Sequence, residues 1–377
     1  MKKNFMRITS LALVIALMLC AFAGCTTSNV EKPTAATIKT DLKDVMFTFT
    51  YGQLREVLPG DQLATLFETI NNKTDDKTVS LSYYELVAKF GNKDYFDKII
   101  DLISEEDMAK FVANQQAVLE YYNKHINEMK AQGLAKVSYG EAFWIDYDNV
   151  VFKDANGNEL SNQGEFKAAF RIYADVCLQN IGSFLMNKGQ DEALEKGADL
   201  TNALYPWGAT YASSLVLDDL IKPTTSTREN MKTQQNAIYS SIIPTLVYDI
   251  DDKGNNKEDE HGENVFVATE YVRTICITVC EDEASVLKAF SLREKSKILD
   301  QFKVAESYLV VEDYSVAFNP CKIIAGFDAV NDQITYATYD KNMIITAQIK
   351  FTGALAQYGT VTVEFPCTSS ITYNFGW

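Results

Sequence analysis

The sequence predicts an α+β protein: a mainly helical N-terminal part with a β-hairpin insert, followed by a mostly antiparallel β-sheet or sandwich with one helix. Two patterns predict this class. Apolar residues recur at helical spacing over most of 41–240, whereas from 241 to 377 they alternate with polar residues at the period of two expected of half-buried strands. Short loops between consecutive strands favour antiparallel pairing. The boundary near residue 240 rests on this change of period alone.

The first helices are marked by their N-terminal capping residues. Ser82 followed by Glu85 forms a capping-box pattern, and Ser104 followed by Asp107 opens a further helix that reaches about residue 131. Both segments carry an apolar stripe at helical spacing, so they need each other or a later element to bury it.

The period changes to two over 142–152, and a turn signal follows at 154–157. This predicts a β-hairpin inserted among helices. Asn162 with Glu165 then begins a strong helix that ends near Gly189. Further helical stretches are expected over about 190–204, 208–221 and 226–240.

The C-terminal part contains the predicted sheet. Strands are expected over 242–250 and 265–280, then an amphipathic helix near 283–303. The last two runs alternate clearly, and their inward faces are predicted to be Met343, Ile345, Ala347, Ile349 and Phe351, and Val361, Val363 and Phe365.

Residues 1–24 have the composition of a secretion signal. Lys2, Lys3 and Arg7 form a positive region, and residues 8–22 form an apolar run too short to span a bilayer comfortably. The run ends at Phe22-Ala23-Gly24-Cys25. Cleavage within or just after these residues is therefore expected.

This ending resembles the lipobox of bacterial lipoproteins, in which small residues precede a cysteine. The resemblance implies that Cys25 is lipidated, that the chain is cut before it, and that the protein is anchored at the outer face of the cytoplasmic membrane. Phe22 stands where that family usually has Leu. Ordinary signal peptidase cleavage after Ala21-Phe22-Ala23 is the alternative. The polar segment 25–40 is expected to be a lipidated tether.

The charge of the chain restricts its partners. The net charge is −16, and loss of the three basic residues of the signal gives −16 − 3 = −19. Nucleic acids and other polyanions are therefore excluded as partners, because binding to them depends on Lys and Arg. A protein, peptide or neutral glycan ligand, and Ca²⁺, remain compatible with the charge.

Five cysteines remain after Cys20 leaves with the signal and Cys25 is lipidated. Disulfides can form outside the membrane. Cys276 and Cys280 are too far apart in one strand to bond each other, because four residues span about 13 Å. The candidates for cross-strand disulfides are Cys276, Cys280, Cys321 and Cys367; the alternative is that all are buried free thiols.

A segment beginning at Asp249 resembles an EF-hand calcium loop. The resemblance implies Asp249, Asp251 and Glu260 as Ca²⁺ ligands, with Gly254 at the turn. Lys253 stands at the fifth ligand position, and strands rather than helices are expected on both sides. A solvated acidic hairpin loop is the alternative.

Two tryptophans are candidates for ligand binding. Trp144 lies in the predicted hairpin, and Trp207 follows Tyr205-Pro206. Aromatic rings stack on the apolar faces of sugars and anchor interfaces. The alternative is that both rings belong to the core.

The sequence contains no coherent catalytic set. Only His125 and His261 are present, and the nucleophile elbow, Walker loop and dinucleotide-binding fingerprint are absent. We therefore expect a membrane-tethered, non-catalytic binding or interaction module outside the cytoplasm. The alternative is a cell-envelope hydrolase that uses paired carboxylates, which 51 acidic residues cannot exclude.

Overall fold

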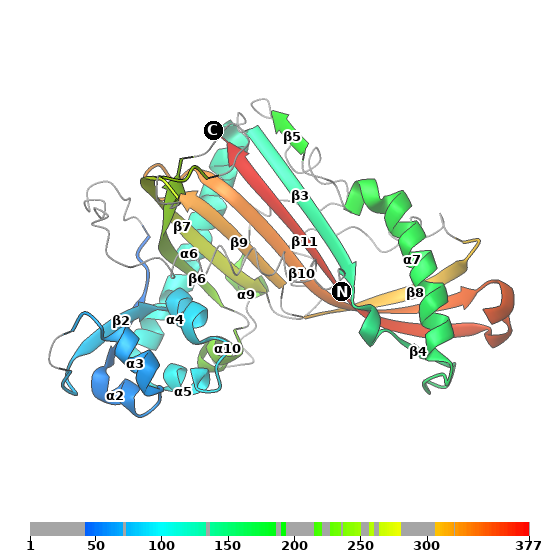
Figure 1. Cartoon of the computed structure of the whole chain (residues 1–377), viewed down its shortest axis with the longest axis horizontal. Helices are drawn as coiled ribbons and strands as arrows, with labels where there is room; N and C mark the ends of the chain where they lie inside the picture. The colour runs from blue at the N-terminus through cyan, green and yellow to red at the C-terminus, as the bar shows by residue number, and fades with distance from the viewer. Residues whose placement is uncertain are drawn as a thin grey trace. The chain divides into compact units, whose positions relative to one another are not determined.

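The computed structural model describes residues 42–70, 73–132, 136–185, 190–193, 215–220, 227–234, 237–249, 256–259, 264–279, 306–319 and 321–376. These residues form α-helices and one large, mostly antiparallel β-sheet (Figure 1), which confirms the α+β class. The predicted helix over 283–303, the tether and the signal segment lie outside the described residues.

The N-terminal elements alternate short strands with helices. In chain order they are β1 (Met46–Thr50), α2 (Tyr51–Arg55), α3 (Gly60–Leu66), β2 (Thr78–Ser82), α4 (Tyr83–Phe90), α5 (Phe96–Asp101) and α6 (Glu105–Gln132). β1 and β2 pair antiparallel as a separate two-stranded sheet. The sequence did not predict this pair, because each strand is only five residues long and runs directly into a helix.

The predicted caps are present. Ser82 Oγ accepts the backbone N–H of Glu85, and Glu85 Oε2 accepts the backbone N–H of Ser82 at 2.8 Å. Ser104 Oγ accepts the N–H of Asp107 at 3.1 Å. These bonds satisfy N–H groups that a helix leaves without intrahelical partners, so α4 and α6 begin where the sequence predicted.

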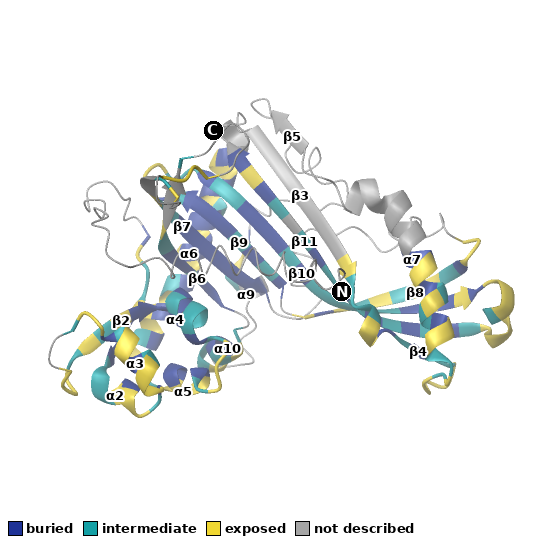
Figure 2. Cartoon of the chain, in the orientation of Figure 1, coloured by how far each residue is buried: buried dark blue, intermediate teal, exposed yellow. Residues whose placement is uncertain are grey.

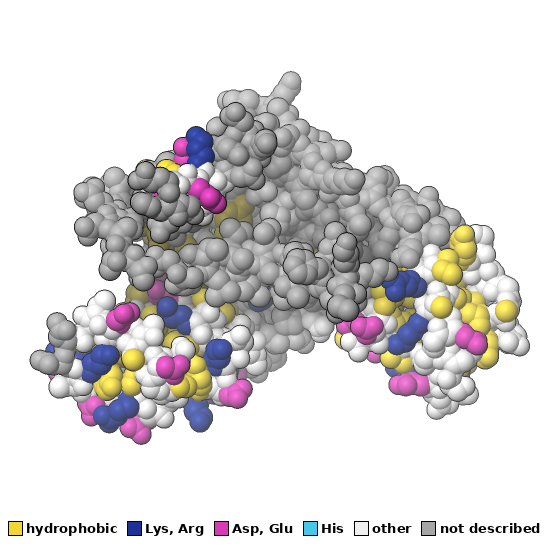
Figure 3. Space-filling model, viewed as in Figure 1, with side chains coloured by type: hydrophobic (Ala, Val, Ile, Leu, Met, Phe, Trp, Pro, Cys, Tyr) yellow, Lys and Arg dark blue, Asp and Glu magenta, His cyan; other side chains and the backbone are white. Residues whose placement is uncertain are grey.

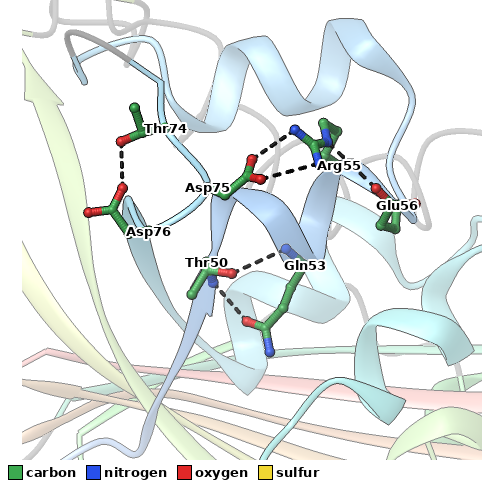
Figure 4. A network of polar contacts seen from close by, with 7 residues as sticks. All are labelled: Thr50, Gln53, Arg55, Glu56, Thr74, Asp75 and Asp76. Carbon is green, nitrogen blue, oxygen red and sulfur yellow. Dashed lines mark hydrogen bonds and ion pairs between the residues drawn. The ribbon is translucent and has the colours of Figure 1, made fainter.

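A second capping box begins α2 (Figure 4). Thr50 and Gln53 bond each other reciprocally, while the backbone N–H of Gly52 donates to Asp75 O at 3.1 Å. Arg55 Nη1 also reaches Asp75 Oδ1 at 2.7 Å. The loop before β2 is thereby fixed to the first turn of α2.

The elements from β3 to α10 include both strands and helices. They are β3 (Lys136–Ile145), the 3₁₀ turn η1 (Tyr147–Asn149), β4 (Val151–Lys153), α7 (Gln163–Leu185), β5 (Gln190–Ala193), α9 (Leu217–Leu220) and α10 (Thr227–Thr233). The turn predicted over 154–157 is present: Gly157 donates its backbone N–H to Asp154 O at 3.0 Å, and Lys153 bridges Glu159 antiparallel, so the chain folds back on β4. β3 and β4 themselves do not pair with each other. Both pair with a distant C-terminal strand, because η1 separates them and offsets their paths along it.

The remaining elements are strands and a 3₁₀ helix. They are β6 (Ile238–Tyr248), β7 (Phe266–Val279), β8 (Leu309–Phe318), β9 (Cys321–Asp328), β10 (Ile334–Phe351), η3 (Gly353–Tyr358) and β11 (Thr360–Gly376). The large sheet has the order β5-β3-β11-β10-β9-β7-β6, with β4 also paired to β11 and β8 to β10. It is a single sheet, so the sandwich alternative does not apply to the described strands.

Two compact units divide the chain. Unit 1 comprises Met1–Phe111, Tyr239–Thr274 and Gly326–Gln333, and unit 2 comprises Val112–Ile238, Ile275–Ala325 and Ile334–Trp377. Each unit thus draws on both halves of the sequence. The division into a helical domain over 41–240 and a β-rich domain over 241–377 stays a prediction.

The core of unit 2 includes the face of β10 and β11 that the sequence assigned to the interior. Register pairs such as Ala347 with Val363 place these residues opposite each other. α7 covers this face through Phe166 and Phe170 (Figures 1 and 2). Further along the same strand, the Tyr339 hydroxyl lies 3.1 Å from that of Tyr122 on α6. The opposite face of β10 and β11 is left for polar side chains.

Candidate functional site

The candidate site is a pocket on the β10–β11 pair in unit 2, with a volume of about 380 Å³. We call it the Trp144 pocket. Its lining residues come from β3, β10, β11 and the adjoining loops: Trp144, Asp146, Asn319, Asn342, Met343, Pro366, Cys367 and Thr368.

The pocket lies where the neighbours of the two long strands change (Figure 1). β10 pairs with β8 up to Phe318, and Asn319 then donates its backbone N–H to Asn342 O at 2.9 Å. On the other side, β11 passes from β4 to β3, and Asp146 donates its backbone N–H to Pro366 O at 3.0 Å. β8 is followed by β9 beside β10, and β4 by β3 beside β11, at the same level of the sheet, and the lining residues of the pocket belong to that level.

Trp144 is at the end of a cross-strand row. It pairs in register with Thr368 of β11, which in turn pairs with Asn342 of β10. Directly opposed residues on neighbouring strands have side chains on the same face. The Trp144 side chain is therefore beside a hydroxyl and an amide, and it stays 41% exposed.

The polar groups of the pocket are held in place by hydrogen bonds. Thr368 Oγ1 donates to Asn342 Oδ1 at 3.0 Å. Asp146 begins η1, and its carboxylate accepts the backbone N–H of Asp148 at 3.2 Å and Nδ2 of Asn149 at 2.7 Å. A carboxylate has about four acceptor positions, so Asp146 keeps acceptor capacity after both bonds.

The remaining lining is apolar. Met343 and Pro366 contribute apolar surface, and Cys367 is 4% exposed. Burial raises the pKa of the Cys367 thiol to about 12. The thiol is therefore neutral at physiological pH and acts as a small apolar group, since the thiolate is the nucleophilic form.

Among the lining residues that the structure describes there is no Lys, Arg or His, and the one acidic residue is Asp146. An exposed indole ring, two side-chain amides, a hydroxyl and one carboxylate therefore converge on the same space. This combination suits a polar, uncharged ligand that has one apolar face.

Of the two predicted tryptophans, the structure describes Trp144 and confirms that it is not a core residue. Trp207 lies outside the described residues. The pocket partners of Trp144 could not be found from sequence, because Asn342 and Thr368 are about 200 positions away and reach it only through strand register. Asp146 is the exception, since it is two positions from Trp144.

The predicted calcium loop is described only in part. Asp249 Oδ2 lies 2.9 Å from Lys257 Nζ, and Lys257 also donates its backbone N–H to Asp249 O. Asp251 and Glu260 lie outside the described residues, and the described part of the chain holds no cluster of three potential metal ligands. Calcium binding stays a prediction, with a lysine paired to its first ligand.

Three cysteines are free thiols in the structure. Cys276, Cys321 and Cys367 are all buried, and no disulfide joins any two of them. Cys321 Sγ lies 3.2 Å from Asn319 O, and burial raises the pKa of this thiol to about 11. For these three cysteines the structure agrees with the alternative stated from the sequence, that they are buried free thiols. Cys280 and Cys25 lie outside the described residues.

Comparison of the chain with protein-family models, curated proteins and solved structures finds no match. Among the helices of the described residues, none is both long and apolar enough to cross a bilayer.

Proposed function

We propose that the protein is a membrane-tethered lipoprotein outside the cytoplasm that acts as a non-catalytic binding module, with the Trp144 pocket as its ligand site. The observation that carries the proposal is the exposed Trp144 ring within a pocket of about 380 Å³. Small-molecule pockets usually have volumes of about 300–1,000 Å³. Tryptophan is also enriched among the residues that dominate binding energy.

The surface charge supports a partner that is not a polyanion. On the face drawn in Figure 3, Lys and Arg side chains are interspersed with Asp and Glu over the helical part of unit 1, and the described side chains there form no basic patch. The net charge of −16 acts in the same direction. Membrane attachment is therefore assigned to the lipid on Cys25 rather than to basic side chains.

The alternative is a cell-envelope hydrolase with paired carboxylates. Burial raises the pKa of Asp340 on β10, as expected of a proton-donating acid. Asp340 accepts a hydrogen bond from Ser370, however, and its register partner is that serine rather than a second acid. The part of the pocket lining that the structure describes also holds a single carboxylate. A binding function is thus the better supported of the two.

Anchoring is tested by Cys25→Ser, with Cys20→Ser as the matched control because Cys20 lies in the segment that is removed. We expect Cys25→Ser to release the protein from the membrane fraction and Cys20→Ser to leave it there, as measured by fractionation and immunoblotting. Retention of the Cys25→Ser protein in the membrane would contradict the lipoprotein assignment.

Binding is tested by thermal unfolding of the purified mature protein with three sets of probes: peptides, oligosaccharides and secreted proteins. A ligand at 100 times its Kd stabilises the folded state by about 2.7 kcal/mol, which raises the melting temperature. We expect a shift with at least one set that Trp144→Ala abolishes. Absence of a Trp144-dependent shift in all three sets would refute the pocket as the ligand site.

A further inference from the structure

We infer that the ligand of the Trp144 pocket is an uncharged sugar ring of a glycan. This inference rests on the proposed binding function and narrows it to one chemical class. A sugar ring has an apolar face formed by C–H groups and an edge of hydroxyl groups, and the pocket presents a separate surface for each.

The apolar face of the ring is matched by Trp144. The indole is 41% exposed, and the described pairing of β5 with β3 covers Lys136–Tyr139 and ends before Trp144. A large aromatic side chain that stays partly exposed forgoes part of its burial free energy. Stacking on a ligand would recover this burial. Pro366, two positions from Thr368 on β11 and so on the same face, extends the apolar surface within the lining.

The hydroxyl edge is matched by amide, hydroxyl and carboxylate groups. A sugar hydroxyl both donates and accepts, as does a side-chain amide, so Asn319 and Asn342 can serve either role. Asn319 is exposed at the end of β8. Asp146 supplies a charged acceptor that η1 already holds in position. Acceptors fixed before binding lower the entropy cost of fixing them in the complex.

An extended peptide fits less well because such peptides bind mainly through backbone pairing with a free strand edge. At the pocket the nearby carbonyls already accept bonds within the protein: Asn342 O from Asn319 N–H, and Pro366 O from Asp146 N–H. Pro366 also has no N–H to donate. Recognition at this place therefore depends on side chains.

A charged glycan is disfavoured as well. The described lining residues include Asp146 and no basic residue, so an anionic sugar would meet a carboxylate without a compensating cation among them. The chain as a whole also carries a net charge of −16. The volume of about 380 Å³ lies near the lower end of the range for small-molecule pockets, which suits a short glycan segment.

The test is isothermal titration calorimetry of the mature protein with defined probes. These are neutral oligosaccharides of glucose, N-acetylglucosamine, mannose and galactose, with polygalacturonate as the anionic glycan and neutral unstructured peptides for comparison. We expect at least one neutral oligosaccharide to bind and polygalacturonate not to bind.

The variants separate stacking from hydrogen bonding. Trp144→Ala should weaken binding of that oligosaccharide by about tenfold or more, and Asn319→Ala and Thr368→Val by about threefold to tenfold each. Tyr308→Ala is the matched control, because Tyr308 is 46% exposed and is not part of the lining. Urea unfolding of each variant checks that the fold is kept.

Each result decides between the two proposals. The sugar inference would be overturned if none of the neutral oligosaccharides bound at about 10 mM. It would also be overturned if the oligosaccharide that binds had the same affinity for Trp144→Ala as for the unchanged protein. Trp144-dependent binding of peptides alone would also overturn it but leave the binding function intact. Trp144-independent binding of every probe would refute both.

Discussion

Arg273 and Asp44 form a buried ion pair in unit 1. Arg273 Nη1 lies 3.0 Å from Asp44 Oδ1, and the two side chains are only 3% and 16% exposed. Asp44 also accepts hydrogen bonds from Ser240 Oγ and from the backbone N–H of Ile242, both on β6. One carboxylate thus fixes the segment just before β1 to β6 and β7, close to the place where the expected tether ends.

The first prediction concerns this pair. Asp44→Ala should destabilise the protein by about 3 kcal/mol, because it removes the carboxylate from a buried guanidinium. Asp75→Ala, which breaks the exposed Arg55–Asp75 pair, should cost about 1 kcal/mol or less. Urea unfolding followed by circular dichroism measures both changes. If both variants lost the same free energy of unfolding, the buried ion pair would contribute no more to stability than the exposed one.

The second prediction contrasts two helix glycines. A Cβ at Gly52 would lie 3.1 Å from Asp75 Cβ, and Asp75 cannot readily move because it is bonded to Arg55 and to the Gly52 backbone. Gly52→Ala should therefore cost about 1–2 kcal/mol despite the better helix propensity of alanine. Gly60→Ala should be neutral or stabilise by up to about 1 kcal/mol, since nothing lies within 4 Å of its added Cβ. A gain in stability for Gly52→Ala in urea would contradict the close approach.

The third prediction concerns Asp340. Burial raises the pKa of its carboxyl above the ordinary value of 3.8, although a hydrogen bond from Ser370 and the charges of Lys322 and Lys341 oppose the shift. The unfolded chain therefore ionises at lower pH than the folded protein, and stability is lost as pH rises through the folded pKa. Asp340→Asn keeps an acceptor for Ser370 and removes the charge, so it should stabilise the protein at pH 7.

The pH dependence distinguishes this cause from a packing effect. The advantage of Asp340→Asn should shrink as the pH falls through the raised pKa of the folded carboxyl, because the protonated carboxyl carries no charge to desolvate. Urea midpoints of both proteins measured between pH 4 and 8 provide the comparison. An advantage that stays constant over this range would assign the effect to packing.

The fourth prediction concerns the thiols. Burial raises the pKa of Cys321 to about 11 and that of Cys367 to about 12, so both are almost fully protonated at pH 8. We expect iodoacetamide to label them slowly in the folded protein and rapidly in urea, because the thiolate is the reactive form. Ser315→Cys supplies an exposed control on β8 that should react quickly.

Mass spectrometry of peptides from the non-reduced protein measures the labelling and detects any disulfide. Rapid modification of Cys367 in the folded state, or a peptide that links Cys276, Cys321 or Cys367 to another cysteine, would contradict the free buried thiols of the structure.

The sequence alone determined the local features of this protein. Ser82 with Glu85 and Ser104 with Asp107 predicted helix starts, because a cap depends on residues three positions apart. Alternation predicted the inward face of β10 and β11, because successive side chains of a strand point to opposite faces. The sequence also marked Trp144 as a candidate for ligand binding, which stays a prediction.

The tertiary structure alone decided which distant residues meet. β3 and β4 both pair with β11, and Cys276, Cys321 and Cys367 stay apart as free thiols. Register brings Thr368 and Asn342 beside Trp144. Hydrophobic periodicity and helix-capping residues carry no information about the order of strands in a sheet, because any strand with one apolar face can pair with any other such strand. The environment of Trp144 therefore became visible only when the strand order was known.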